Sequence, residues 1–323
     1  MKHFFYVLFC VLCLGAFQAC GGDSDSDTGP DYPGGGDYPN SDGEEDDPLE
    51  VEGLHTPAQI KDPVFLAYLL EHFDSDHDGV LTKYEACAIN KLTLDADQDP
   101  SLASIRTLEG ISELEYLNVL KINFPISTID LHDCGRLGVL ECGFCSVEEL
   151  ILDHCGALEH LFCPGNKLTS LNVSDCMYLY FLECGENPIA SLDVSHHHRL
   201  RKFICPSNTQ MTSLDLSDCP ELVEVICDSN KLTSLNVSGC TSLEKIFCYD
   251  NKLTTLDVSD CTKLTWLTCG FNKLKTLDIS ENTQLLSLFA FGNYMETLYV
   301  WKGFRIKDMD DCRLDPDTQI VEK

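Results

Sequence analysis

Basic residues are scarce in this chain of 323 residues, which carries 22 Lys and Arg against 53 Asp and Glu. The formal net charge of −31 argues against a nucleic-acid partner, which requires clustered positive charge. It also argues against adhesion to anionic lipid through charge. No Lys or Arg occurs from Gly21 to Glu52, where acids, Gly and Pro dominate. A segment of that composition cannot bury enough apolar surface to fold.

Catalytic motifs are missing as well. The histidines form no spacing with Ser or Cys that indicates an activated nucleophile, and no Gly-rich motif suited to phosphate is present. His196, His197 and His198 stand together, but His197 fills a repeat position and we assign no metal to the triplet. We therefore expect a binding protein, and an enzyme is the function that the sequence supports least.

The N-terminus carries an apolar run, FFYVLFCVLCLGAF, that is too short to span a membrane. With Lys2 before it and Cys20 after it, residues 1–19 are predicted to be a signal peptide. Ala19-Cys20-Gly21-Gly22 resembles a bacterial lipobox, although Phe17 stands where Leu is usual. The resemblance implies cleavage before Cys20 and lipidation of its thiol. An ordinary secretory signal is the alternative.

Residues 20–56 are predicted to be an acidic disordered tether that holds the folded part off a membrane. An acidic stretch after a lipidated Cys resembles the export signals of surface lipoproteins in some Gram-negative anaerobes. This resemblance implies a lipid anchor in the outer membrane and a position at the cell surface. A plain solvated linker is the alternative.

A unit of 21 residues repeats along most of the chain, as in LEKIFCYDNKLTTLDVSDCTK from Leu243 to Lys263. Its halves follow the patterns L-x-x-L-x-C-x-x-N-x and L-x-x-L-x-V/I-x-x-C/N-x-x. One such unit cannot bury its own apolar face, so the repeat predicts stacked coils.

Three positions of the unit form columns, and the register slips only by one extra residue near Thr209 and Gln210. The first-half Asn column, with Cys145 one copy earlier, contains Asn166, Asn187, Asn208, Asn230, Asn251, Asn272 and Asn293. The first-half Cys column contains Cys142, Cys163, Cys184, Cys205, Cys227, Cys248 and Cys269, and it ends at Ala290. The second-half column contains Cys134, Cys155, Cys176, His197, Cys219, Cys240 and Cys261, and it ends at Asn282.

Each half matches the pattern L-x-x-L-x-L-x-x-N/C-x-L, and residues 117–302 resemble the nested, IRREKO-type leucine-rich repeats of bacterial surface proteins. The resemblance implies a mainly β fold, a parallel solenoid with two short strands per coil. We count eight full coils and a partial ninth, which at about 4.8 Å per strand gives a length of roughly 40 Å. Asn side chains at the turns can satisfy backbone groups of the neighbouring coil as a ladder.

The chain has 19 cysteines, and thirteen of them lie in the two columns. Stacked Cys side chains have Cβ atoms about one strand spacing apart, wider than the roughly 3.8 Å that a disulfide prefers. We therefore expect buried, free thiols, with cross-links as the alternative. Cys142 and Cys145 match C-x-x-C, but both are explained by the repeat rather than by zinc or redox chemistry.

Residues 57–104 contain a candidate calcium loop that starts at Asp74 and ends at Glu85 and fits D-x-[DN]-x-[DN]-G-x5-E. It resembles an EF-hand. The predicted Ca²⁺ ligands are the side chains or backbone carbonyl of Asp74, Asp76, Asp78, Val80, Thr82 and Glu85. An acidic turn without metal is the alternative.

EF-hands usually come in pairs, but Asp95-Ala-Asp97-Gln-Asp99 lacks the Gly and Glu of a second loop. We expect no metal there, and a lone loop is more consistent with a structural staple than with a sensor. Residues 105–116 are predicted to be an N-terminal cap, and the polar residues 303–323 a C-terminal cap.

The two outward faces of the coil differ. Second halves place Ser or Thr and then Asn or Asp outward, a uniform polar face. First halves place a variable aromatic and apolar strip outward, and such a strip usually marks an interface. The predicted ligand residues are Phe162, Phe181, Ile204, Ile226, Phe247, Tyr249, Trp266, Phe271, Phe289 and Phe291.

These features together predict a lipid-anchored surface protein with one calcium site that recognises an unidentified protein ligand. A glycan-binding accessory lipoprotein is the alternative, since aromatic side chains also stack on sugar rings. The strip could instead be covered by other parts of the chain.

Overall fold

The structure, a computed structural model, describes residues 54–306 and 309–323. The predicted signal peptide, the lipidation site Cys20 and nearly all of the predicted tether therefore lie outside the described residues. Within the described ranges, no helix is both long enough and apolar enough to cross a membrane.

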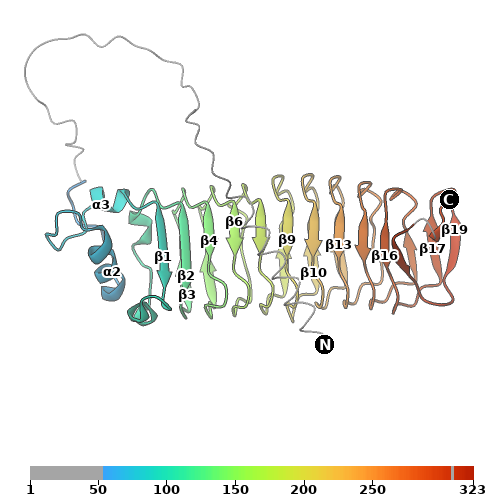
Figure 1. Cartoon of the computed structure of the whole chain (residues 1–323), viewed down its shortest axis with the longest axis horizontal. Coiled ribbons are helices and arrows are strands. Elements are labelled where there is room, and N and C mark those ends of the chain that lie inside the picture. The colour runs from blue at the N-terminus through green and yellow to red at the C-terminus, as the bar shows by residue number, and fades with distance from the viewer. Residues whose placement is uncertain (1–53, 307–308) are drawn as a thin grey trace, which may run out of the picture. The chain divides into compact units, whose positions relative to one another are not determined.

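Short strands lie side by side along an elongated stack of coils (Figure 1). First halves supply one sheet of 11 strands, in which every recorded pair is parallel. We call it the large sheet. In spatial order it contains β1 (Lys91–Asp95), β2 (Val119–Asn123), β4 (Val139–Glu141), β6 (His160–Phe162), β7 (Phe181–Glu183), β9 (Lys202–Ile204), β11 (Glu224–Ile226), β13 (Lys245–Phe247), β14 (Trp266–Thr268), β16 (Ser287–Phe289) and β18 (Asp311–Arg313).

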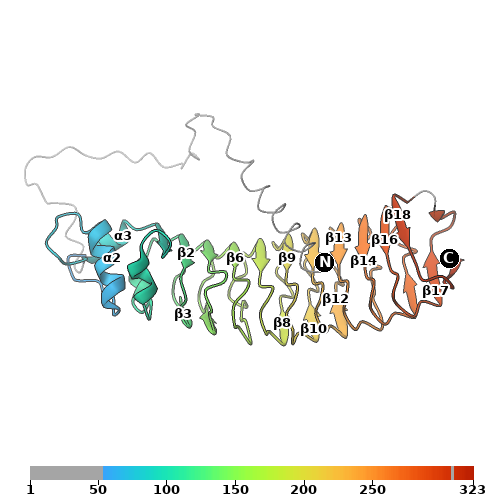
Figure 2. The ribbon, with the colours of Figure 1, turned by 60° about the horizontal axis from the view of Figure 1, so that its bottom comes forward.

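Second halves supply the opposite face, which Figure 2 shows below the large sheet. It is divided into three shorter parallel sheets that we call together the small-sheet face. They contain β3 (Thr128–Asp130) and β5 (Glu149–Ile151); β8 (Ser191–Asp193), β10 (Ser213–Asp215) and β12 (Ser234–Asn236); and β15 (Thr276–Asp278), β17 (Thr297–Val300) and β19 (Gln319–Glu322). The predicted mainly β parallel solenoid is confirmed.

Strand pairing places equal repeat positions next to one another, as in Val225 beside Ile246 and Ile246 beside Leu267. All three side chains are fully buried between the two faces. Lys202 pairs with Glu224, a step of 22 residues, so the extra residue is absorbed in a turn and the register is kept. Stacking of identical positions thus builds one continuous apolar core.

The sheets extend beyond the predicted repeat at both ends. β1 lies inside the predicted calcium segment and pairs with β2, with Lys91 beside Val119 at a step of 28 residues. β18 and β19 lie inside the predicted C-terminal cap and continue both faces. The coils at the ends are longer than 21 residues, so a search at that period does not find them.

Helices close the N-terminal end of the stack: α2 (Pro63–Phe73), α3 (Lys83–Cys87) and the 3₁₀ turns η2 (Pro100–Ser104) and η3 (Ile111–Glu113). Asp62 caps α2 by accepting hydrogen bonds from Val64 N at 2.9 Å and Phe65 N at 3.1 Å. Its other oxygen accepts one from Arg106 N at 2.8 Å, which ties the helix to the first coil. Phe65 and Leu69, four residues apart, bury the inner side of α2.

Candidate ligand face and calcium loop

Six aromatic side chains gather on the outer side of the large sheet near its C-terminal end. Along the strands, the ring centroids of Phe247 and Trp266 lie 6.3 Å apart, and those of Trp266 and Phe289 lie 6.1 Å apart. At the adjoining turns, Phe271 lies 5.1 Å from Tyr249 and 5.2 Å from Phe291. We call these residues the aromatic cluster: Phe247, Tyr249, Trp266, Phe271, Phe289 and Phe291.

The repeat geometry explains why these side chains face outward. Phe247 and Phe289 occupy the same outward position of β13 and β16, on either side of Thr268. Phe271 stands in the turn with φ 52°, a left-handed conformation that the turn requires at this position of the unit. Gly292 occupies the equivalent turn position in the next coil and has φ 75°. A Cβ at Gly292 would lie 3.1 Å from the Phe271 ring. A glycine at this point lets the two turns approach closely.

Exposure differs among the residues predicted to bind a ligand. Trp266 is 37% exposed and Phe271 is 45% exposed, so the strip is not covered by the described parts of the chain. Ile204 and Ile226 are only 5% and 7% exposed, because outward side chains stacked at one strand spacing cover one another. They offer little surface to a ligand.

Phe162 and Phe181 lie nearer the N-terminal end of the same face and are partly buried. His160 contacts Phe181 with ring centroids 6.2 Å apart, and it contacts Tyr180 at 5.7 Å. The Arg201 guanidinium lies over the Tyr180 ring at 5.7 Å. Sequence reasoning missed Tyr180, because it precedes the strand position that the repeat marks as outward.

The outer face of the large sheet carries several basic side chains, although the chain as a whole is strongly acidic. From β9 to β18 the outward strand positions include Lys202, Lys245 and Arg313 against Glu224 and Asp311. Lys202 pairs with Glu224 at 2.8 Å, and Arg313 lies over the Phe289 ring at 5.5 Å. This part of the face therefore does not share the strong acidity of the whole chain.

Two partly buried carboxyl groups belong to first halves of the repeat: Glu183 in β7 and Asp228 just after β11. Burial raises the pKa of Glu183 to about 7, although nearby Lys202 lowers it. Burial likewise raises the pKa of Asp228 to about 7, although Asp228 Oδ1 accepts a hydrogen bond of 2.6 Å from Tyr249 N. Both groups change charge near neutral pH.

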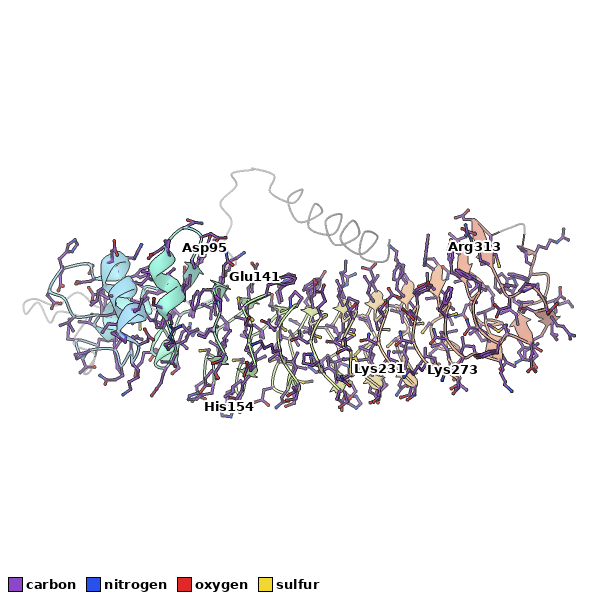
Figure 3. All side chains as sticks on the ribbon, turned by 90° about the horizontal axis from the view of Figure 1, so that it is seen from below. Asp95, Glu141, His154, Lys231, Lys273 and Arg313 are labelled. Atoms are coloured by element: carbon purple, nitrogen blue, oxygen red, sulfur yellow. The ribbon has the colours of Figure 1, made fainter. Side chains whose placement is uncertain are left out.

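The small-sheet face is polar and uniform, as predicted. Ser195 N donates to Asp193 Oδ1 at 2.9 Å, and Ser259 N donates to Asp257 Oδ1 at 3.0 Å. The same contact recurs in other coils, so each outward Asp or Asn is held by its own turn. Figure 3 shows Glu141 and Arg313 of the large sheet on one side and His154 at a second-half turn on the other.

The candidate calcium loop brings three carboxylates together. One oxygen each of Asp74, Asp76 and Asp78 lies within 4.8 Å of the others. Backbone amides hold them in place: Asp74 accepts from His77 N at 2.8 Å and Gly79 N at 2.9 Å. Gly79 has φ 83° with open space around it, so the turn demands Gly through its conformation. Oxygen-rich clusters of this kind suit Ca²⁺.

Glu85 is the predicted carboxylate ligand that the structure does not bring into this group. It is 6% exposed, and its oxygens accept from Ser75 N and Oγ and from Thr82 N and Oγ1, at 2.7 to 2.9 Å. Burial alone would raise the pKa of Glu85, but these hydrogen bonds outweigh it and lower the pKa to about 2. Four donors use the acceptor capacity of a carboxylate, so Ca²⁺ would compete with Ser75 and Thr82 for Glu85.

The loop is also paired with the chain that precedes α2. Ala58 N donates to Leu81 O at 2.8 Å, and Lys83 N donates to Thr56 O at 2.9 Å. Pro57 and Thr82 form an antiparallel bridge. The short strand of the lone loop thus pairs with residues 56–58, where a paired EF-hand would supply a second loop. No motif or spacing in the sequence predicts this contact.

The rejected second loop, at Asp95, Asp97 and Asp99, is occupied by other contacts. Asn123 Nδ2 donates to Asp95 Oδ1 at 2.8 Å and to Asp97 Oδ2 at 3.1 Å. Asp99 caps η2 by accepting from Ser101 N at 3.0 Å. An amide from β2 therefore fills the space between two of the carboxylates.

The predicted columns stand inside the stack. The Asn side chains bridge coils: Asn251 Nδ2 donates to Cys227 O at 2.9 Å in the preceding coil and to Cys248 O at 3.2 Å in its own. The cysteines of both columns are buried and free, so the predicted thiol rows are confirmed. His197 is buried in the second-half column, with Nε2 3.1 Å from Val173 O.

Among solved structures, the chain is similar to the functional domain of InlJ from Listeria monocytogenes, which is described as including a cysteine ladder. The two share 25% identity with a TM-score of 0.63, over 82% of this chain and 62% of that one. The fold is a leucine-rich-repeat solenoid. The chain thus spans about 62% of the length of the InlJ domain that it matches.

Two other bacterial structures are more distant. The internalin InlF of Listeria monocytogenes has 19% identity and a TM-score of 0.40, over 82% of this chain and 98% of that one. The leucine-rich-repeat protein LIC12759 of Leptospira interrogans has 14% identity and a TM-score of 0.43, over 80% of this chain and 88% of that one. No protein-family model matches the chain, and no curated protein matches its sequence.

Proposed function

We propose that this chain is a lipid-anchored binding protein of the outer-membrane surface, and that the aromatic cluster docks a protein partner. One observation carries the proposal: six aromatic side chains form two rows of three, one along the strands and one at the adjoining turns, and two of them are more than a third exposed. Aromatic anchors of this kind dominate the binding energy of protein interfaces.

The surroundings of the cluster support a protein ligand. Arg313 stands at one end over Phe289, and Lys245 lies beside Trp266 in the pairing of β13 with β14. Arg and aromatic residues are enriched at interface cores. The β-strands fix these side chains on a rigid support, so docking orders little that is not already ordered.

A calcium ion is part of the proposal. Asp74, Asp76 and Asp78 would hold it with the Val80 carbonyl and Thr82, and Glu85 would join after releasing Ser75 or Thr82. The ion would neutralise three carboxylates that stand within 4.8 Å of one another. Because the loop pairs with residues 56–58, the ion would also strengthen the junction between the solenoid and the chain before it.

The anchor and the location rest on sequence alone. Cys20 would carry the lipid, and the acidic residues after it would hold the solenoid away from the membrane. No catalytic role is proposed, because the exposed side chains of the ligand face include no nucleophile activated by a base.

Partner capture by variants of the full chain tests the ligand face. We expect the double variant Phe247→Ala/Trp266→Ala to lose at least about tenfold in affinity for a partner that the unmodified chain captures from surface extracts. The matched control, Ser191→Ala/Asp193→Ala on the small-sheet face, should keep it. Circular dichroism of each variant verifies the fold. Equal capture by all three proteins would overturn the proposal, and loss of binding to a glycan array in the same variant would change the ligand class to glycan.

A further inference from the structure

A groove of about 760 Å³ with both polar and apolar lining lies on the small-sheet face near its C-terminal end, on the side of the stack opposite the aromatic cluster. Its floor is made of residues of β12, β15 and the coil between them, and one wall is formed by the residues that follow β17. The lining includes Thr255, Asp257, Thr276, Asp278, Trp301 and Lys302. Its volume lies within the range of small-molecule sites.

The floor presents the same polar pair in successive coils. Thr255 and Thr276 occupy one outward position, and Asp257 and Asp278 occupy the next, so hydroxyls and carboxylates repeat at about 4.8 Å. Asp257 is exposed and makes no ion pair among residues 54–306 and 309–323. Its turn holds it through Ser259, and these hydrogen bonds lower the pKa of Asp257, so it is an ionised acceptor at neutral pH.

Trp301 supplies a fixed aromatic wall. It is partly buried, and its ring packs edge-on against Phe304, with centroids 4.8 Å apart. Lys323 pairs with Asp278 across the groove and lies 4.3 Å from the Tyr299 ring centroid. The rest of the lining is mixed: Leu235 and Leu256 lie among the Ser, Thr and Asp side chains of the floor.

We propose that this groove binds a neutral oligosaccharide. Sugar hydroxyls both donate and accept hydrogen bonds, so they match alternating Asp carboxylates and Thr hydroxyls, and the apolar side of a sugar ring suits an aromatic wall. The repeated lining matches a ligand that is itself a repeat. This site is separate from the proposed protein-binding face, and its test does not depend on that face.

The chain holds two tryptophans, and each reports on one face. Trp266→Phe leaves Trp301 as the single emitter, in the groove, whereas Trp301→Phe leaves Trp266, in the aromatic cluster. The purified full chain in each form is titrated with cellotetraose, maltotetraose, mannotetraose and chitotetraose, up to about 10 mM. We expect at least one probe to shift Trp301 emission saturably, with a dissociation constant of about 1 mM, and to leave Trp266 emission unchanged.

Asp257→Asn in the Trp266→Phe background should weaken that binding about tenfold, because hydrogen bonds to a charged group are lost. Asp193→Asn is the matched control: it has the same repeat position and the same Ser contact, three coils before Asp257 and outside the groove. No saturable change at Trp301 with any probe overturns the proposal. A change at Trp266 instead, or equal weakening by both Asp variants, also overturns it.

Discussion

Asn251 Oδ1 accepts a hydrogen bond of 2.9 Å from Leu232 N, which lies in the preceding coil. Asn230 makes the same donor contacts, to Cys205 O in the preceding coil at 2.9 Å and to Cys227 O in its own coil at 2.8 Å, but its Oδ1 has no partner among the described residues. The extra residue before it changes the preceding turn, where Met211 N donates to Asn208 O at 3.0 Å. The ladder is therefore complete at Asn251 and interrupted at Asn230.

This difference predicts that replacing Asn by Ala destabilises the protein more at Asn251 than at Asn230. Asn251→Ala leaves the buried Leu232 N without an acceptor, whereas Asn230→Ala removes donor contacts alone. We expect Asn251→Ala to reduce the free energy of unfolding by about 1–2 kcal/mol more than Asn230→Ala does. Urea denaturation of both variants measures this difference in the free energy of unfolding. Equal losses would mean that the bond between coils contributes nothing measurable.

Replacing Cys by Ser is expected to destabilise the protein less in the second-half column than in the first-half column. Cys240 Sγ donates to Leu216 O at 3.1 Å, so a hydroxyl can replace it. Within the described ranges the Cys248 thiol makes no hydrogen bond, and it is fully buried. Cys248→Ser should therefore be about 1–2 kcal/mol more destabilising than Cys240→Ser, since a buried hydroxyl would lack a partner. Thermal melting of both variants compares their stabilities. A larger loss of stability for Cys240→Ser than for Cys248→Ser would contradict the packing described.

Glu183 and Asp228 predict a stability that falls as the pH rises. In the unfolded chain these carboxyls ionise near pH 4, whereas burial holds their folded pKa at about 7. The unfolded state is thus increasingly favoured from about pH 4 to 7, and the penalty remains above pH 7. Glu183→Gln and Asp228→Asn should each stabilise the protein on the order of 1–2 kcal/mol at pH 8 and little at pH 4.

The control for these variants is Glu109→Gln, an exposed residue before β2 that is not among the groups shifting the pKa of Glu183 or Asp228. It should change stability equally at both pH values. Denaturation at pH 4 and pH 8 makes the comparison. A gain at pH 4 that matches the gain at pH 8 would show that the removed carboxyl was not protonated in the folded protein.

Calcium removal should lower the melting temperature of the intact protein. Without a cation the carboxylates of Asp74, Asp76 and Asp78 repel one another, and a ligand that binds the folded state alone stabilises it. We expect chelation to lower the melting point by a few degrees, with no such effect in Asp76→Asn. Asp97→Asn, in the rejected loop, should keep the full effect. Identical melting with and without chelator would remove the calcium site from the account.

The 21-residue period was enough to predict the solenoid, because columns such as Asn251 and Cys248 recur where stacking places one side chain over the next. It could not predict β1 or β18, whose coils depart from that length. The burial of Ile204 and Ile226 also escaped prediction, because the strand pattern gives direction but not the cover provided by neighbouring coils.

The calcium loop shows the same limit at the level of single contacts. The motif identified Asp74, Asp76 and Asp78 by spacing alone, and their carboxylates do converge. Spacing could not reveal that Glu85 is held by Ser75 and Thr82, nor that Leu81 pairs with Ala58. These contacts depend on which neighbouring donors lie within reach once the chain is folded.

A photo-reactive phenylalanine analogue placed in the full chain on intact cells tests the central claim most directly. One form carries it at Phe271, in the aromatic cluster, and the other carries it at Lys252, an exposed residue of the preceding repeat that lies outside the cluster. The account predicts a protein adduct from the position of Phe271 and none from that of Lys252. Adducts from Lys252 alone, or equal adducts from both positions, would contradict it.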